Sequence, residues 1–179
     1  MPDMHNAASA AVTTAIPPGT ELATFGAGCF WGVEQILARL DGVTSTAVGY
    51  MGGPIERPTY EQVCTGRTEH AEVVQVTFDA SRIRYEALID VFWHLHDPTQ
   101  VDRQGPDVGR QYRSVVFTHN DSQATVARET RDAINASGAL RRPVATEIVA
   151  ATTFWKGEAY HQQYFDRRGV DGCHLYPAW

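Results

Sequence analysis

The thiol of Cys29 is the side chain best placed for nucleophilic or redox chemistry. It lies in the run Gly-Ala-Gly-Cys-Phe-Trp-Gly (26–32), after a partly apolar stretch, Glu21–Phe25, and before residues 33–40, whose apolar side chains recur at helical spacing. This pattern predicts a strand, a turn flanked by glycines and a helix, with Cys29 at or near the first helical turn. Unpaired backbone N–H groups and the positive end of a helix dipole favour the thiolate there, which is the reactive form of cysteine.

Two large aromatic residues, Phe30 and Trp31, follow Cys29 directly. They could form an apolar wall beside the sulfur. The alternative is that Cys29 is a small buried hydrophobic residue and that both aromatic rings belong to the core. The other cysteines, Cys64 and Cys173, are too few and too scattered for a disulfide scaffold, and none of the three has the spacing of a zinc ligand pair.

A carboxylate, Glu72, begins a stretch with strand periodicity, Glu72–Phe78. Alternation along a strand puts Glu72 on the same face as Val74, Val76 and Phe78. A carboxylate on such an apolar face either pairs with a cation or keeps its proton, which raises its pKa toward the range of a general acid. The alternative is an exposed first strand residue that pairs with nothing.

Two tyrosines and an aspartate lie in or beside glycine-rich loops. Tyr60 and Tyr112 could present their hydroxyl groups to a ligand, or could be packed core residues. Asp107 belongs to the loop His96–Gln111, which is long enough to suggest a function, although most loop aspartates are solvated or form turns. Cys173 lies in a glycine-rich tail and is either a resolving thiol, able to swing, or a cysteine without a role.

The expected elements run strand-helix-strand-strand-helix-strand, followed by a helix, a strand and a short helix. We expect strands over 21–25, 43–50, 72–78, 112–117 and 144–149, and helices over 33–40, 85–95, 122–135 and 158–165. The order predicts an α+β fold, a two-layer sandwich with a ferredoxin-like (split βαβ) mixed sheet at its core and long active-site loops. Residues 1–20 are expected to be a disordered N-terminal tail, and residues 21–179 a single domain with a flexible C-terminal tail.

Composition narrows the class of protein. The chain has 179 residues, of which 43% are hydrophobic and 20% charged, as expected for one soluble globular domain. Its net charge of −6 disfavours binding to nucleic acid or to an anionic membrane. No apolar run approaches the ~18 residues that would cross a bilayer, and the first 20 residues lack the basic start of a secretory signal. We therefore expect a cytoplasmic protein.

These residues, taken together, resemble one family. The run 28–32 resembles the active-site signature of the A-type peptide methionine sulfoxide reductases, which act on the S epimer. The similarity covers nearly everything from Leu22 onward. It continues through Val48-Gly49-Tyr50 with Gly52-Gly53, Tyr60-Glu61-Gln62-Val63-Cys64-Thr65-Gly66, His70-Ala71-Glu72-Val73, His96-Asp97-Pro98-Thr99, Gln104-Gly105 with Asp107 and Gly109, Gln111-Tyr112-Arg113-Ser114, and Tyr160-His161-Gln162.

The resemblance implies a role for each candidate catalytic residue. Cys29 would be the nucleophile that becomes a sulfenic acid. Glu72 would protonate the sulfoxide oxygen, with Tyr60 and Tyr112 donating hydrogen bonds to it. Cys173 would be the resolving cysteine that condenses with the sulfenic acid to form a disulfide.

The resemblance also implies how substrate binds and which partners take part. Phe30 and Trp31 would form the pocket for the S-methyl group, and Asp107 would orient the substrate. The expected substrates are oxidised proteins and peptides, and the electron donor is thioredoxin or another dithiol, with no cofactor or metal. We expect a monomer that repairs oxidised proteins. Three residues depart from the family pattern: Asp102 stands where asparagine is usual, Arg110 where a small polar residue is usual, and Glu69 where glycine is common. The tail also lacks the tyrosine often found beside the cysteine, and it has one cysteine where some members have two.

Two other functions compete with this interpretation. A thiol peroxidase also passes through a sulfenic acid, but needs neither a wide methyl pocket nor a dedicated acid. A ligand-binding domain could use Phe30 and Trp31 as a platform without any reaction at Cys29.

Overall fold

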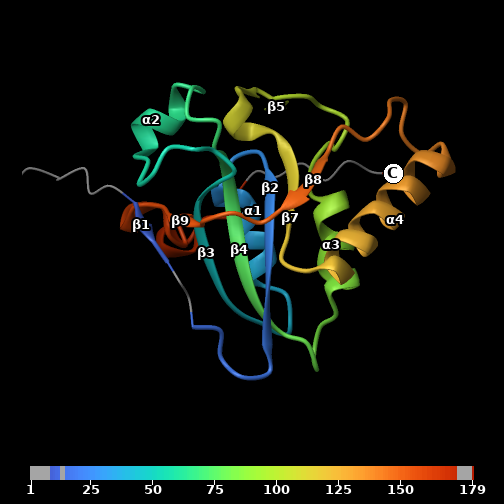
Figure 1. The fold of residues 1–179 in the computed structure, drawn as a ribbon, viewed down its shortest axis with the longest axis horizontal. Helices are drawn as coiled ribbons and strands as arrows, with labels where there is room; N and C mark the ends of the chain where they lie inside the picture. Colours follow the sequence, from blue (N-terminus) through green and yellow to red (C-terminus); the bar gives the residue numbers. More distant parts are fainter. Residues whose placement is uncertain (1–8, 13–14, 173–178) are drawn as a thin grey trace, which may run out of the picture.

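The computed structural model describes residues 9–12, 15–172 and 179, and its centre is a seven-stranded mixed sheet (Figure 1). The strand order is β1-β9-β3-β4-β2-β7-β8. The strands are β1 (Ala10–Ala11), β2 (Thr20–Ala27), β3 (Val43–Met51), β4 (Ala71–Asp79), β7 (Ser114–Thr118), β8 (Glu147–Ala150) and β9 (Trp155–Lys156). A separate hairpin pairs β5 (Arg103–Gln104) with β6 (Asp107–Val108).

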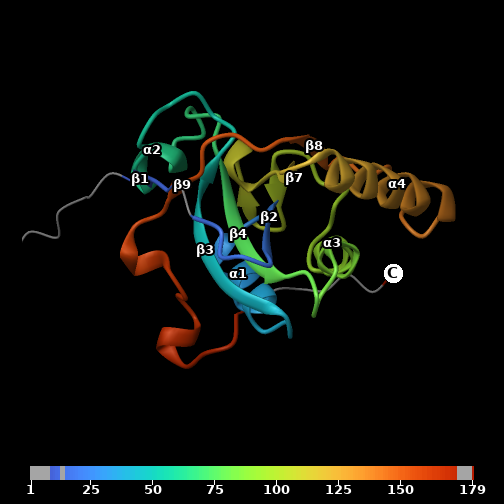
Figure 2. The same cartoon turned by 60° about the horizontal axis from the view of Figure 1, so that its bottom comes forward.

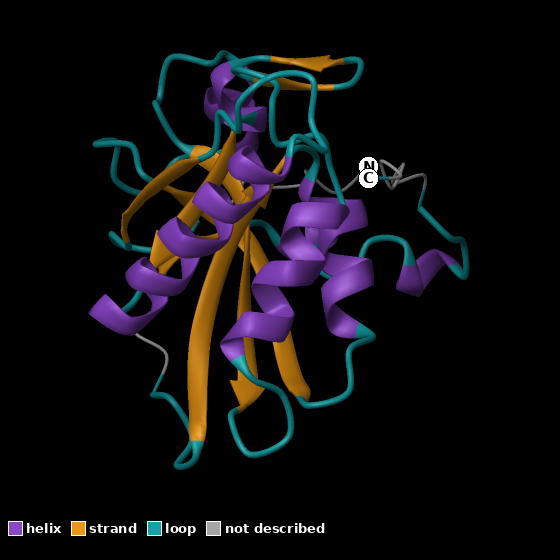
Figure 3. Ribbon diagram, turned by 90° about the vertical axis from the view of Figure 1, so that its right-hand side faces the viewer, coloured by secondary structure: helices purple, strands orange, loops and turns teal. Residues whose placement is uncertain are grey.

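The longer helices gather on one face of the sheet, as Figure 3 shows. The α-helices are α1 (Phe30–Ala38), α2 (Tyr60–Cys64), α3 (Tyr85–His94) and α4 (Asp121–Ser137). Short 3-10 helices are η1 (Arg110–Tyr112), η2 (Ala159–His161) and η3 (Asp166–Arg168). No helix among the described residues is both long and apolar enough to cross a membrane.

The predicted ferredoxin-like core is confirmed. The elements β2, α1, β3, β4, α3 and β7 follow one another, and their four strands lie in the order β3-β4-β2-β7 with antiparallel neighbours. Helix α4 then leads to β8, which pairs with β7 in parallel. In Figure 1 the chain from β8 to β9 crosses the near face of the sheet, while α1 lies behind it.

Strand β4 lies in the middle of the sheet and supplies both apolar clusters. Its residues Val74, Val76 and Phe78 join the larger cluster under the helices. Its residues Ala71 and Val73 join a smaller cluster on the opposite face. The period of two therefore works as predicted, although both faces of this strand are buried.

One predicted helix is wrong, and two predicted strands are present with shifted bounds. The helix expected over 158–165 is only the short turn η2, because side chains of this segment bond to the sheet instead. The side-chain Oε1 of Gln162 accepts a hydrogen bond from the N–H of Val48, and its Nε2 donates one to the carbonyl oxygen of Val48, both at 3.0 Å. The strand expected to begin at Tyr112 begins at Ser114, after η1, and the strand expected over 144–149 is Glu147–Ala150. The loop 96–111 also contains the hairpin β5–β6, which was not predicted.

The N-terminal residues 1–20 include ordered structure that was not expected. Ala10 and Ala11 form β1 and pair with β9, and the hydroxyl of Ser9 donates a hydrogen bond to the carbonyl of Pro58 at 2.6 Å. This part of the segment expected to be disordered therefore extends the sheet. Cys173 lies outside the described residues, as does most of the tail that follows it.

Candidate active site

Cys29 lies at the turn between β2 and α1, as the sequence predicted. It is the N-cap residue of α1, with φ −55° and ψ 121°, and its side chain makes no capping hydrogen bond. Gly28 precedes it with φ +90°, and a Cβ there would come within 2.8 Å of the side chain of Gln104 in β5. Glycine thus allows the β5–β6 hairpin to lie against the turn. In Figure 1, α2 and β5 both lie at the upper end of the sheet, where β2 ends.

The Cys29 thiol has a pKa raised to about 12. Burial is the largest cause and the negative charge of Glu72 the second. The backbone N–H groups of Trp31 and Gly32 lower the pKa, as expected at the start of a helix, but they do so less strongly. The sequence predicted a lowered pKa for Cys29, whereas the pKa is raised, because burial removes the water that would stabilise a thiolate. At neutral pH the resting group is a thiol.

Glu72 in β4 is buried, with 2% of its surface exposed. Its Oε2 accepts a hydrogen bond from the backbone N–H of Phe30 at 3.2 Å. Burial is the main cause of the raised pKa of this carboxyl group; the Phe30 N–H opposes the rise, the charge of Asp107 adds to it, and the resulting pKa is about 8. The predicted position on the apolar face is confirmed, and the alternative of an exposed strand end is wrong.

Three short elements bring Tyr60, Asp107 and Tyr112 close to Glu72: Tyr60 begins α2, Asp107 begins β6 and Tyr112 ends η1. The pKa of the Tyr112 hydroxyl is raised by burial first and then by the charge of Glu72, with Cys64, Asp107 and Cys29 contributing. Burial and the charge of Glu72 likewise raise the pKa of Tyr60. Both phenols are therefore protonated donors at neutral pH. The carboxylate of Asp107 raises the pKa of both Cys29 and Glu72, so it lies within electrostatic range of the two.

The aromatic residues after Cys29 have different surroundings. Phe30 is buried in the core, with ring centroids 5.9 Å from Tyr50 and 5.2 Å from His161. Trp31 is half-buried and stacks on Tyr164, with a centroid distance of 3.7 Å and planes 3° apart. The core interpretation therefore holds for Phe30, whereas Trp31 is only partly buried and packs against the edge of the core.

Two residues of the site were not singled out from the sequence, Glu158 and His161. His161 has 0% exposure, and its Nδ1 accepts a hydrogen bond from Nε1 of Trp31 at 3.0 Å. The proton of its neutral ring therefore lies on Nε2, which is 3.5 Å from Glu158 Oε2. Glu158 accepts hydrogen bonds from the Tyr50 hydroxyl and the Tyr60 N–H, both at 2.8 Å.

These two residues connect Trp31 to the segment that carries Tyr60. Burial lowers the pKa of His161, so the ring stays neutral and keeps its acceptor nitrogen at physiological pH. The sequence motif Tyr160-His161-Gln162 marked the position through the family resemblance. Nothing in its local pattern indicated contact with Trp31, which lies 130 positions away.

Two of the three cysteines, Cys29 and Cys64, lie among the described residues. Cys29 and Cys64 are both free thiols. Cys64 ends α2, where the Tyr60 hydroxyl donates a hydrogen bond to its sulfur, and burial raises its pKa. Cys173, the predicted partner of Cys29, lies outside the described residues.

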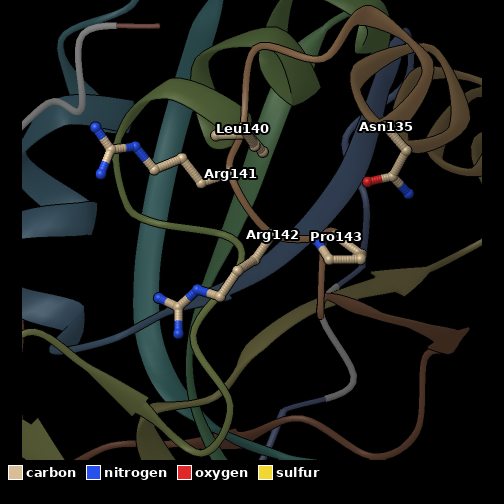
Figure 4. Close-up of a pocket in the computed structure, with 5 residues that line it drawn as sticks. All are labelled: Asn135, Leu140, Arg141, Arg142 and Pro143. Atoms are coloured by element: carbon tan, nitrogen blue, oxygen red, sulfur yellow. The ribbon is translucent and has the colours of Figure 1, made fainter.

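A separate hollow of about 430 Å³ lies beyond the C-terminal part of α4 (Figure 4). It is lined by Asn135, Leu140, Arg141, Arg142 and Pro143. In Figure 4 both arginine side chains extend away from Asn135. None of the candidate catalytic residues lines this hollow, and we assign it no part in the chemistry.

Comparison with known proteins gives a consistent result. Residues 21–178 match the family model described as "Peptide methionine sulfoxide reductase". A protein of Methanoculleus marisnigri named "Peptide methionine sulfoxide reductase MsrA" is 58% identical over 153 residues, which cover 86% of this chain and 93% of that protein.

Solved structures share the fold. Mxr1 from Saccharomyces cerevisiae in its reduced form has a TM-score of 0.81 at 32% identity, with 89% of this chain and 93% of that chain covered. A structure of Mxr1 in complex with Trx2 has a TM-score of 0.59 at 24% identity, covering 89% and 90% of the two chains, and supports the fold alone.

Proposed function

This chain belongs to the peptide methionine sulfoxide reductase family and is an enzyme of the MsrA type, and from that premise we propose how it works. It reduces the S epimer of methionine sulfoxide, in proteins and as the free amino acid, to methionine. It thereby repairs oxidatively damaged proteins. The electrons come from its own cysteines and then from thioredoxin or another dithiol, and we assign no metal or organic cofactor.

Glu72 is the acid of the reductase step. A sulfoxide sulfur is a weak electrophile until its oxygen is protonated or strongly hydrogen-bonded. The raised pKa of Glu72, about 8, keeps a transferable proton on this carboxyl group at neutral pH. The half-buried hydroxyls of Tyr60 and Tyr112 donate further hydrogen bonds to the same oxygen.

Cys29 is the nucleophile. Once Glu72 has protonated the sulfoxide oxygen, the sulfur of Cys29 attacks the sulfoxide sulfur, and the thiol proton passes to the Glu72 carboxylate. The hydroxyl group then moves from the methionine sulfur to the sulfur of Cys29, as its bond to the methionine sulfur and the bond between the two sulfurs break. Methionine leaves, and Cys29 is left as a sulfenic acid. Cysteine sulfur is oxidised and methionine sulfur is reduced by two electrons each, and no external proton is consumed.

The substrate is held by its methyl group and its backbone. The exposed part of the Trp31 ring, fixed by Tyr164 and His161, forms the wall against the methyl group, and Phe30 supports it from the core. Asp107, on the hairpin above the site, orients the polar part of the substrate.

A second thiol closes the cycle. The thiol of Cys173 attacks the sulfenic acid, forming a Cys29–Cys173 disulfide and releasing water. Thiol–disulfide exchange with thioredoxin then returns both cysteines to thiols. A cysteine in the flexible tail predicted from the sequence supports this assignment.

The observation that carries the proposal is a neutral, buried carboxyl group within electrostatic range of a half-buried thiol at the start of a helix. The test is a thiol count before and after excess methionine sulfoxide is added to the reduced enzyme without reductant. We expect one methionine and the loss of two thiols per chain with the S epimer, and no reaction with the R epimer. Consumption of hydrogen peroxide with no methionine formed would favour a thiol peroxidase instead.

A further inference from the structure

The side-chain amide of Gln35 forms hydrogen bonds with the segment of chain immediately before Cys173. Gln35 belongs to α1 and is only 6% exposed. Its Nε2 donates to the carbonyl of Val170 at 3.0 Å and to Asp166 Oδ1 at 2.8 Å. Its Oε1 accepts from the N–H of Gly172 at 2.8 Å. Both amide protons and the oxygen therefore have partners on one short segment, 166–172.

Contacts around this amide fix the same segment less strongly. Arg39 donates to Asp166 at 3.2 Å and to Asp171 at 3.0 Å, but its side chain is 58% exposed and that of Asp171 83% exposed, so these pairs contribute little. Gly172 lies against Phe165, since a Cβ there would come within 2.5 Å of that ring. The buried amide of Gln35 is therefore the principal anchor.

The anchored segment lies next to the active site. Cys29 begins the helix that carries Gln35, six residues earlier, which corresponds to about 9 Å along the helix axis. Phe165, which contacts Gly172, packs edge-on against Trp31 with ring centroids 6.3 Å apart. Figure 2 shows the chain after β9 running out past the sheet and returning to α1.

We propose that Gln35 is a positioning residue for the resolving step, because it fixes the backbone up to Gly172 on the helix that presents Cys29. Only one peptide bond then separates the last fixed residue from Cys173. A short tether confines a thiol to a small volume and raises its effective concentration at a nearby target. The inference rests on the proposed role of Cys173 and adds the reason why that thiol finds Cys29.

The test separates the two chemical steps in the full-length reduced enzyme. Methionine-S-sulfoxide is mixed with the enzyme without reductant, and samples quenched over time are analysed for methionine and for the Cys29–Cys173 disulfide by mass spectrometry. Gln35→Met keeps the length of the side chain and removes all three hydrogen bonds. We expect its methionine burst to keep the wild-type amplitude and its disulfide to form about threefold to tenfold more slowly.

The matched control is Gln123→Met. Gln123 is equally buried and its side chain also bonds to main-chain groups, those of Leu22 and His119, but it belongs to α4. We expect disulfide formation at the wild-type rate in this variant. Turnover supported by dithiothreitol, which bypasses Cys173, reports whether either variant still folds and reacts.

The outcomes distinguish the inference from the proposed function. A normal rate of disulfide formation in Gln35→Met, or a faster one, would overturn the positioning role while leaving the resolving role of Cys173 intact. If the wild-type enzyme forms methionine but no Cys29–Cys173 disulfide, the resolving step itself is wrong and the positioning role falls with it. Equal slowing in Gln123→Met would assign the effect to general destabilisation and would also contradict the inference.

Discussion

The chemistry of the site depends on the order of two pKa values. Glu72 has a pKa of about 8 and Cys29 one of about 12, and burial is the largest cause of both shifts. At neutral pH both groups hold their protons, so the Glu72 charge that would oppose a thiolate is absent. In the proposed mechanism Glu72 first gives its proton to the substrate and then takes the proton of the thiol. One carboxyl group therefore serves as acid and then as base.

The raised pKa of Glu72 predicts how the reductase step depends on pH. Its acid form is lost as the pH rises through about 8, so the single-turnover rate should fall about tenfold per pH unit above that value. The thiolate form of Cys29 does not compensate, because its pKa of about 12 lies far above this window. Rapid quench at pH 6 to 10 measures the profile, and a rate that climbs between pH 8 and 10 would mean that thiolate formation, not Glu72, limits the reaction.

His161 should act on substrate binding through Trp31. His161→Phe keeps an aromatic ring in the buried site but removes the acceptor for the Trp31 Nε1–H. One lost buried hydrogen bond costs about 1 kcal/mol, so we expect KM to rise roughly fivefold with kcat nearly unchanged. Steady-state kinetics with dithiothreitol measures both constants. Tyr160→Phe is the control, since it keeps the neighbouring ring and changes an exposed residue; a KM that rises equally in both variants would contradict the anchoring role.

At the scale of elements, the sequence predicts segments whose pattern is local. The strand, turn and helix around Cys29 and the alternation that buries Glu72 were both predictable, because apolar periodicity and glycine placement specify them. The hairpin β5–β6 was not, because strands of two residues have no measurable period. The segment 158–165 carries helix-favouring residues, but Gln162 bonds to Val48 in β3 and Glu158 to Tyr60 at the start of α2 instead.

The pKa of Cys29 was mispredicted for a related reason. The helix start is visible in the sequence, whereas burial depends on what folds over it. The β5–β6 hairpin lies against the turn at Gly28, and Glu72 comes from the middle of the sheet. The N–H groups of Trp31 and Gly32 lower the pKa of Cys29. Burial and the charges of Glu72 and Asp107, which are more than 40 positions away in the sequence, raise it by a larger amount.

At the scale of the whole molecule, four stretches of chain meet at one end of the sheet. They contain Cys29, Tyr60 with Glu72, Asp107 with Tyr112, and Glu158 with His161. Two of the residues that depart from the family pattern also meet, since Arg110 bonds to Asp102 and to Glu147 of β8, both at 3.2 Å. These ion pairs join the loop that carries Asp107 to the edge of the sheet.

Burial of Glu72 should also appear in the stability of the whole molecule. The folded pKa of about 8 lies above the ordinary value of 4.5, so the folded state binds the proton more tightly than the unfolded state. The stabilisation is complete below about pH 4.5 and is lost as the pH rises to about 8. Glutamine does not titrate, so the Glu72→Gln variant does not lose this stabilisation. The free energy of unfolding of the variant minus that of the wild type should therefore increase between about pH 4.5 and 8 and stay constant above about pH 8. Urea unfolding at pH 4, 7 and 9 measures the difference, and one that does not change with pH would contradict the raised pKa.

The central claim is that Glu72 supplies the proton that makes the sulfoxide reducible by Cys29, and the single-turnover rate of Glu72→Gln tests it most directly. Glutamine keeps the shape and a hydrogen-bond donor but has no transferable proton, so we expect a fall of about 10²- to 10⁴-fold in the rate of methionine formation. Glu34→Gln is the matched control, because Glu34 is also buried with a raised pKa but bonds to Thr46 and Gln163, and it should react within about twofold of wild type. A fall of less than about threefold in Glu72→Gln would contradict the account, because Tyr60 and Tyr112 would then suffice to activate the sulfoxide.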